Sequence, residues 1–239
     1  MMKKRNVMIL FSATVALTLA ACGSKEQSSS TSSNAGKTKY ASEVTHDGTP
    51  IKGGTLKYAI VSSSPFSGIF ADELSADTND STIGGLLDES MFEYDENRKL
   101  TNTGLASIEF DVENKTATVT LNSKDYKWSD GQPVTIDDYI FAYQAIGNKD
   151  YTGVRYDDDY KNVVGMEDYH DGKADSVSGL EKVDDYTVKI HFKEMSPSMQ
   201  LAGGSVCAYI MPKHIFKDIP ETEREQSDYV RGTKFVGLG

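Results

Sequence analysis

The spacing of apolar residues between positions 108 and 146 limits the fold of this chain more than any other feature does. Apolar side chains alternate with polar ones over residues 108–112 and 117–121, on either side of the polar residues 113–115. This two-residue period predicts a β-hairpin with one apolar face. Over residues 136–146 the apolar positions recur at intervals of three and four, which predicts an amphipathic helix that can cover that face.

The segment at 127–138, KWSDGQPVTIDD, joins these two elements and contains the only tryptophan of the chain. Residues 129–131 are typical of a tight turn, and Pro133 restricts its own backbone and that of the preceding residue. Thr135 and Asp138 have the spacing of a capping box, so the aspartates at the start of the helix have a structural role. We therefore interpret the segment as a scaffold corner rather than as a sugar site beside a catalytic acid.

Further elements are predicted by the same criteria. We expect a strand at 56–60, a helix that begins at Asp80–Ser81 and includes Met91, a strand at 186–192, and a short helix that begins at Pro212. Gly147 is expected to be the C-terminal cap of the helix at 136–146, and the acidic and aromatic residues at 148–176 are expected to form a solvated loop. Strands and helices are mixed without repeats or a βαβ period, which predicts an α+β fold.

The N-terminus has the features of an export signal. Basic residues at 3–5 precede an uncharged apolar run at 7–21, which is shorter than the roughly 20 residues that span a bilayer. The run ends in Leu19-Ala20-Ala21-Cys22, which resembles the lipobox of bacterial lipoproteins. This resemblance implies a signal peptide at 1–21 and a diacylated Cys22, held at the outer face of the cytoplasmic membrane by its acyl anchor alone. The Ser-rich residues at 22–50 are expected to be a lipidated, flexible tether.

Charge and cysteine content exclude several classes of ligand. Without the three basic residues of the signal, 22 Lys and Arg stand against 36 Asp and Glu, and such a surface repels nucleic acid and anionic lipid. Cys207 is the only cysteine besides Cys22 and lies in an apolar run, so we expect a buried packing residue and no disulfide. The acidic run Asp157–Asp159 lacks the spacing of a calcium loop. The sequence predicts no metal, cofactor or catalytic site.

Several motifs occur in the same order as in the extracytoplasmic solute-binding proteins of oligopeptide and dipeptide ABC importers, and the chain resembles the N-terminal portion of that family over about residues 50–239. The run Trp-Ser-Asp-Gly-x-Pro-Val-Thr is the most specific of them. The matching residues are Gly53-Gly54-Thr55-Leu56, Trp128–Thr135 with Asp137, Asp138 and Phe141, Val183–Val188, and Met211–Ile215.

This resemblance implies the two-lobe fold of the peptide-binding class of periplasmic binding proteins, of which the chain has only the N-terminal part. Residues 51–77 are expected to belong to the first lobe, residues 78–192 to form a small N-terminal α+β domain, and residues 193–239 to return to the first lobe. The chain is expected to be truncated, because it stops at Gly237-Leu238-Gly239, inside the next motif of the family.

The resemblance also implies a monomeric, lipid-anchored, non-enzymatic protein that captures oligopeptides outside the membrane and delivers them to the subunits of an ABC permease. In the family the loop after the first strand borders the ligand cleft, and tyrosines after the motif helix approach it. The implied ligand-binding residues are therefore Phe66, Ile69, Phe70, Glu73, Tyr151 and Tyr156. Two alternatives remain open: the same fold binding nickel, haem or a signalling peptide, and an exported hydrolase that uses paired carboxylates.

Overall fold

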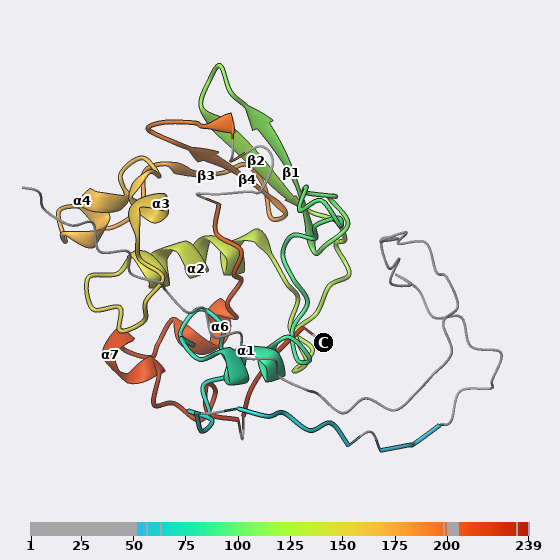
Figure 1. Cartoon of the computed structure of the whole chain (residues 1–239). Coiled ribbons are helices and arrows are strands. Elements are labelled where there is room, and N and C mark those ends of the chain that lie inside the picture. Colours follow the sequence, from blue (N-terminus) through green and yellow to red (C-terminus); the bar gives the residue numbers. More distant parts are fainter. Residues whose placement is uncertain are drawn as a thin grey trace, which may run out of the picture. The chain divides into compact units, whose positions relative to one another are not determined.

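The computed structural model describes residues 52–238, apart from 56, 63, 198, 200–205 and 233. The predicted signal peptide, Cys22 and the tether lie outside the described residues. The chain divides into two units, Met1–Leu56 and Lys57–Gly239. In the first unit the described residues 52–55 are exposed and include a turn at 52–53. All described helices and strands belong to the second unit (Figure 1).

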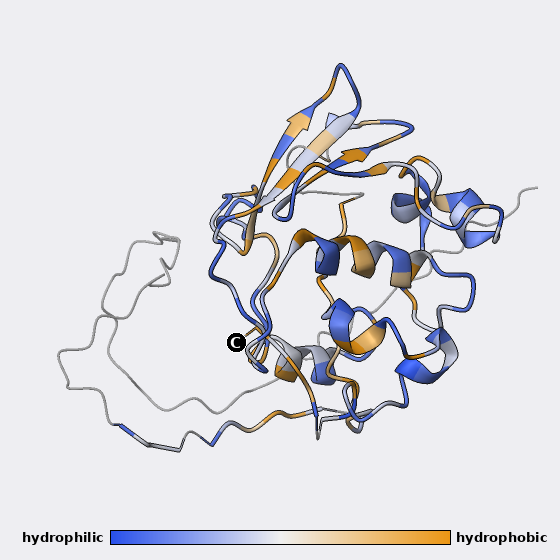
Figure 2. Cartoon of the chain, turned by 180° about the vertical axis from the view of Figure 1, so that it is seen from behind, coloured by the Kyte–Doolittle hydropathy of each residue, from blue (hydrophilic) through white to orange (hydrophobic). Residues whose placement is uncertain are grey.

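The hairpin predicted around 108–121 is confirmed as half of a four-stranded antiparallel sheet with the order β1-β2-β4-β3. In the register Val119 lies opposite both Ile108 and Val188, so apolar side chains of three strands form one row. These residues are buried while their neighbours are more exposed, and Figure 2 shows the alternation along the strands. The strands are β1 (Ala106–Asp111), β2 (Thr116–Leu121), β3 (Leu180–Lys182) and β4 (Thr187–His191).

Helix α2 (Ile136–Gly147) confirms the predicted amphipathic helix and lies beneath the sheet, in contact with β3 and β4 (Figures 1 and 2). Ile136, Tyr139 and Ile146 are completely buried. Burial of each such side chain contributes about 1.5–3 kcal/mol before conformational entropy is subtracted. The sheet and α2 together form the main part of the core and confirm the predicted α+β class.

The prediction that Gly147 is the C-terminal cap of this helix was wrong. Gly147 is the last helical residue, and Asn148 is the C-cap with an extended backbone. A Cβ atom at position 147 would lie 2.4 Å from the sulfur of Met166, which belongs to helix α4 (Met166–His170). Any larger residue at 147 would force Met166 to shift, because α4 packs closely against α2, and no helix-ending pattern reveals this tertiary contact.

The corner at 127–138 is confirmed as a scaffold element organised by the Asp138 carboxylate. The buried indole of Trp128 donates its Nε1–H to Asp138 at 3.3 Å, and the backbone N–H of Thr135 donates to the same oxygen at 2.9 Å. The other carboxylate oxygen accepts the backbone N–H of Lys213 at 2.9 Å. Asp138 is only 5% exposed, and both of its carboxylate oxygens accept these structural hydrogen bonds. A catalytic role for this carboxylate would require the loss of these hydrogen bonds.

Two predicted elements differ from the structure. Helix α1 (Thr78–Gly84) is capped by Asp77, whose carboxylate accepts the backbone N–H of Asn79 at 2.7 Å. It ends before the predicted residues 86–91 because consecutive glycines at 84 and 85 disfavour helix. The strand expected at 56–60 is absent from its described part. Residues 57–60 have no regular structure, since none of the described strands pairs with them.

The segment at 148–176 is not simply a solvated loop, because it contains α3 (Asp158–Lys161) and α4. The acidic run begins α3: the Asp157 carboxylate accepts the backbone N–H groups of Asp159 and Tyr160. The short helix expected after Pro212 is α6 (Lys213–Phe216), and α7 (Glu221–Arg224) was not predicted. Among the helices that the structure describes, none combines the length and the apolar character needed to cross a bilayer.

Candidate functional site

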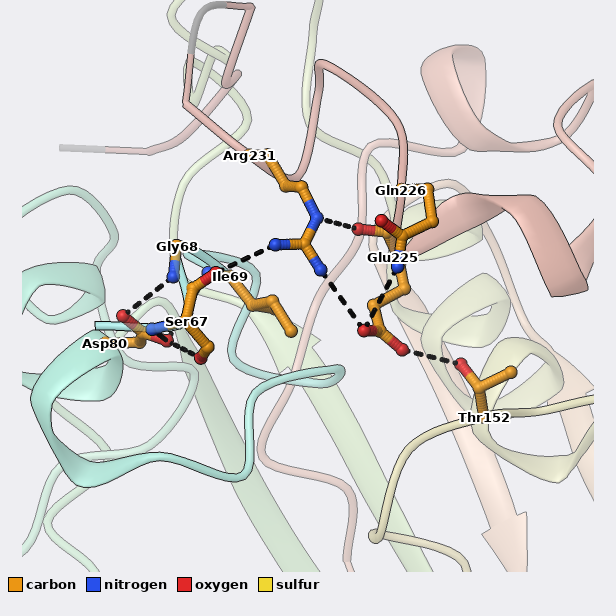
Figure 3. A network of polar contacts seen from close by, with 8 residues as sticks. All are labelled: Ser67, Gly68, Ile69, Asp80, Thr152, Glu225, Gln226 and Arg231. Carbon is orange, nitrogen blue, oxygen red and sulfur yellow. Dashed lines mark hydrogen bonds and ion pairs between the residues drawn. The ribbon is translucent and has the colours of Figure 1, made fainter. Parts of the chain in front are cut away.

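The loop at 64–77, hereafter the binding loop, carries four of the six predicted ligand residues and is held in shape by Asp80. Asp80 lies in α1, is completely buried, and accepts the backbone N–H groups of Ser67 at 3.1 Å, Gly68 at 3.2 Å and Ile69 at 3.4 Å, together with the Ser67 hydroxyl (Figure 3). Burial disfavours the charged form, but these hydrogen bonds outweigh it and lower the pKa of Asp80. An ionised carboxylate therefore fixes the first half of the binding loop.

Arg231 fixes the same loop from the C-terminal side. Its guanidinium donates to the Ser67 carbonyl at 2.8 Å, and to the carbonyl and carboxylate of Glu225 at 2.9 and 3.3 Å (Figure 3). The Glu225 carboxylate also accepts the hydroxyl of Thr152 at 3.4 Å, which brings the segment after α2 into the network. The sequence does not reveal this role of Asp80 and Arg231, because their partners lie in other segments and neither residue belongs to a motif.

The second half of the binding loop is anchored by residues that follow α2. The Tyr151 hydroxyl donates to the backbone carbonyl of Glu73. The Arg155 guanidinium donates to the carbonyls of Asp72 and Ser75 at 3.3 and 2.9 Å. The structure therefore places Tyr151 beside Glu73, two residues that the family resemblance implied for the ligand cleft.

The other predicted ligand residues lie in different surroundings. Ile69 is buried in the core, and Phe70 is half-buried with its ring close to Gly232. Phe66 remains 51% exposed on the binding loop. Tyr156 stacks on the imidazole of His170 with ring centroids 4.0 Å apart. Of these four, only Phe66 presents a largely free apolar side chain.

A cavity of about 380 Å³ adjoins the binding loop. Its wall includes three carboxyl groups from the binding loop and the segment after α1, namely those of Asp72, Glu73 and Asp88, and the aromatic residues Phe92 and Tyr209. Glu73 is only 6% exposed, so its carboxyl group faces the cavity from a buried position. The cavity brings together segments that are more than a hundred residues apart in the sequence.

Burial dominates the electrostatics of this cavity. It raises the pKa of Glu73 to about 8, and the neighbouring charges of Asp88 and Asp72 add to this effect while Arg224 opposes it. Burial also raises the pKa of Asp88 to about 6, although the Leu238 backbone N–H donates to this carboxylate at 2.7 Å. The pKa of Asp72 is raised by burial too, against the opposing influence of Arg155. At neutral pH Glu73 is therefore mostly protonated.

Tyr209 is positioned through its neighbour Cys207. The Cys207 backbone N–H donates to the Tyr143 hydroxyl, and its carbonyl accepts the Tyr139 hydroxyl, both at 2.8 Å. The thiol is buried, and burial raises its pKa to about 12. The expectation of a buried packing cysteine is confirmed, and this residue attaches the cavity wall to α2.

The carboxyl groups of this cavity could serve either to bind a ligand or to transfer protons in acid–base catalysis, and their chemistry alone does not distinguish the two. Carboxyl groups with shifted pKa values suit proton transfer, which is the chemistry that the hydrolase alternative requires. In the part of the chain that the structure describes, no group of three or more His, Cys, Asp or Glu residues is arranged to hold a metal ion. Comparison with known proteins separates binding from catalysis.

Residues 102–239 match the family described as bacterial extracellular solute-binding proteins, family 5 middle. The oligopeptide-binding protein OppA of Lactococcus lactis subsp. lactis is 37% identical over 226 residues, which cover 91% of this chain and 38% of that protein. The structure of lactococcal OppA, complexed with an endogenous peptide in the closed conformation, is similar with a TM-score of 0.69 and 36% identity, over 74% of this chain and 34% of that one. AppA from Bacillus subtilis in complex with a nonapeptide is similar with a TM-score of 0.57 and 26% identity, over 72% and 30% of the two chains. The chain thus spans between 30% and 38% of the length of these relatives.

Proposed function

The chain belongs to the bacterial extracellular solute-binding proteins of family 5, and from this membership we propose that it is part of the substrate-binding component of an ABC importer that captures oligopeptides. The observation that carries the proposal is the similarity to lactococcal OppA, which extends over 91% of the chain in sequence and includes a structure with a bound peptide. The family is one of binding proteins, so the chain is not an enzyme. The predicted fold, that of the peptide-binding class of periplasmic binding proteins, is confirmed by the same structures.

We further propose that the captured peptide is delivered to a permease in the membrane by a monomeric, lipid-anchored protein. The lipobox-like Leu19–Cys22 supports an acyl anchor at the outer face of the cytoplasmic membrane, and the Ser-rich residues after it support a tether. Because the chain spans 38% of the length of OppA, we propose that it supplies one side of the ligand cleft and that a longer protein supplies the other side.

The geometry of the binding loop supports this role. Asp80 and Arg231 hold the loop before any ligand arrives, so little conformational entropy remains to be lost when a peptide binds. Phe66 offers an exposed apolar surface, and the cavity offers polar groups beside it. Ligand sites of this kind combine apolar contacts with a few polar groups that orient the ligand.

Isothermal titration calorimetry of the full-length protein with a mixture of short peptides tests the proposal. We expect saturable binding that weakens when Phe66 is replaced by alanine. Val112→Ala is the matched control, because Val112 is a similarly exposed apolar residue (48%) at the tip of the β1–β2 hairpin. At about 1 mM peptide even a weak complex with a binding free energy of about −4 kcal/mol would form. If no heat of binding is detected up to that concentration, the proposal is overturned.

A further inference from the structure

We propose that Glu221, on helix α7, is a positioning residue for the binding loop, and that the hold of α7 on this loop weakens when Glu221 loses its proton. The inference rests on the proposed function, because the loop that α7 positions is the one proposed to receive the peptide. It concerns the regulation of that site and not the identity of the ligand. Its consequence is that a peptide binds more tightly at acidic pH than at neutral pH.

The segment that follows α7 holds the binding loop at two points. The guanidinium of Arg231, which is bound by the carbonyl and the carboxylate of Glu225, donates to the Ser67 carbonyl at 2.8 Å (Figure 3). The backbone N–H of Phe70 donates to the Val230 carbonyl at 3.1 Å. Glu225 is the C-cap of α7, so the position of α7 determines where both contacts can form.

Helix α7 is docked on α2 through the side chain of Arg224. This guanidinium lies over the ring of Phe141 in α2, 5.0 Å from its centroid, and donates its Nε–H to the Ile219 carbonyl at 3.2 Å. It also forms an ion pair with the Glu221 carboxylate, and Glu221, Arg224 and Phe141 are all more than nine-tenths buried. Because α7 has only four residues, too few for a stable helix by itself, its position depends on such tertiary contacts.

The Glu221 carboxylate is only half satisfied in the docked position. One oxygen accepts a hydrogen bond from Arg224, whereas Oε1 is buried and has no hydrogen-bond partner among the described residues. Water solvates both oxygens of an exposed carboxylate, so docking of α7 penalises the ionised form of Glu221 more than the neutral form. The geometry therefore favours a protonated Glu221 whenever α7 is docked.

The charged groups around Glu221 modify this preference without reversing it. Burial raises the pKa of Glu221 from its ordinary value of 4.5 to about 7, the charge of Asp150 adds to this effect, and the Arg224 guanidinium opposes it. The phenol of Tyr169 on α4 also interacts with Glu221 and is neutral, because burial raises its pKa. Glu221 in the docked helix thus exchanges its proton near neutral pH.

A pKa that is higher in the docked helix than in water makes docking weaker as pH rises. Below about pH 4.5 Glu221 is protonated whether α7 is docked or not, and the hold of α7 has its full strength. Between pH 4.5 and about 7 docking takes up a proton, so its equilibrium constant should fall by up to about 10-fold per pH unit and then level off. If the peptide requires the anchored loop, its apparent affinity falls with the fraction of molecules in which the loop is anchored.

The first arm of the test is hydrogen exchange of the full-length protein without ligand, followed at the Phe70 amide. Glu221→Gln imitates the protonated carboxyl group at every pH. Between pH 5 and pH 7 the wild type should lose about 30-fold more protection at this amide than Glu221→Gln does, after correction for the intrinsic exchange rate. Both proteins contain Glu73, so its titration cancels in the comparison. Glu223→Gln, at an exposed position of the same helix, is the control with the same change of charge and should follow the wild type.

Two results of this arm overturn the proposal. One is an equal pH profile for the wild type and Glu221→Gln. The other is an equal loss of protection at the amides of β2 and β4, which would mean that Glu221 acts on the stability of the whole fold and not on the binding loop.

The second arm measures peptide affinity by calorimetry at pH 5 and pH 7. The affinity of the wild type and of Glu223→Gln should fall at least about 3-fold more than that of Glu221→Gln. Equal falls in all three proteins would show that the anchored loop does not govern peptide binding, and they also overturn the proposal. Absence of peptide binding in every variant would instead overturn the proposed function, while the exchange arm would still decide whether α7 anchors the loop.

Discussion

Replacement of Asp138 tests whether the corner at 127–138 is a structural joint. The Asp138 carboxylate accepts three hydrogen bonds, from the Trp128 indole, the Thr135 backbone and the Lys213 backbone, and it thereby connects the corner, the start of α2 and the start of α6. Asp138→Ala removes all three acceptors at once. Asp138→Asn keeps one carbonyl oxygen and turns an amide N–H₂ toward the remaining donor.

The magnitude follows from the donors that lose their acceptor. A buried donor without a partner destabilises the folded state by about 1–3 kcal/mol, and the indole of Trp128 is the most buried of the three. The two backbone donors are partly accessible to water, so we expect about 3–5 kcal/mol for Asp138→Ala. For Asp138→Asn, where one donor faces the amide, we expect about 1–3 kcal/mol. The neighbouring Asp137 forms only surface ion pairs with Lys182 and Lys213, and its replacement by alanine should change stability by less than about 1 kcal/mol.

The assay is urea unfolding followed by tryptophan fluorescence, because Trp128 is the only tryptophan and is buried in the joint. Linear extrapolation gives the free energy of unfolding for wild type, Asp138→Ala, Asp138→Asn and Asp137→Ala. We expect the order of destabilisation Asp138→Ala, then Asp138→Asn, then Asp137→Ala. Equal losses for Asp138→Ala and Asp137→Ala would refute the argument that Asp138 holds the corner.

Three further predictions concern other parts of the chain. Gly147→Ala should destabilise the protein by about 1–3 kcal/mol, since its Cβ would collide with Met166. Measured by thermal unfolding, this destabilisation should be smaller in a Met166→Ala background, and strictly additive effects of the two substitutions would contradict the packing argument. Burial raises the folded-state pKa of Glu73 to about 8, so stability that is present at acidic pH should be lost as pH rises through that value. Glu73→Gln should flatten this loss in urea unfolding between about pH 5 and pH 9, and an unchanged pH profile would exclude Glu73 as its source. Cys22→Ala should abolish acylation and leave unprocessed or released protein, whereas palmitate labelling of the variant would rule out Cys22 as the anchor.

Local patterns predicted those elements whose stability depends on local contacts. The hairpin and α2 were predicted because period-two and helical spacing persist over many residues, and the corner because Thr135 and Asp138 form a short-range motif. Strand β3 escaped prediction because it has only three residues and two of them are exposed. Its position depends on pairing with β4, which the sequence of β3 does not specify.

The candidate site was predicted only in part, for the same physical reason. Glu73 and Tyr151 were selected by family resemblance, and the structure places them together. Asp88 and Tyr209 were not selected, because the cavity forms where distant segments meet and no sequence spacing records that meeting. Asp80 was expected to cap a helix, but Asp77 caps α1 and leaves the Asp80 side chain free to fold back onto the binding loop.

The hydrogen bond between Arg231 and the Ser67 carbonyl also bears on the order of folding. It joins residues 164 positions apart, whereas neighbouring strands β1 and β2 are joined across a turn of a few residues. The entropy of closing so long a loop must be overcome before the contact contributes any stability, so contacts of this separation form after local ones. We therefore expect the hairpin and α2 to assemble before the segment around Arg231 docks, whereas Asp80, only 13 positions from Ser67, can hold the first half of the binding loop before Arg231 completes its shape.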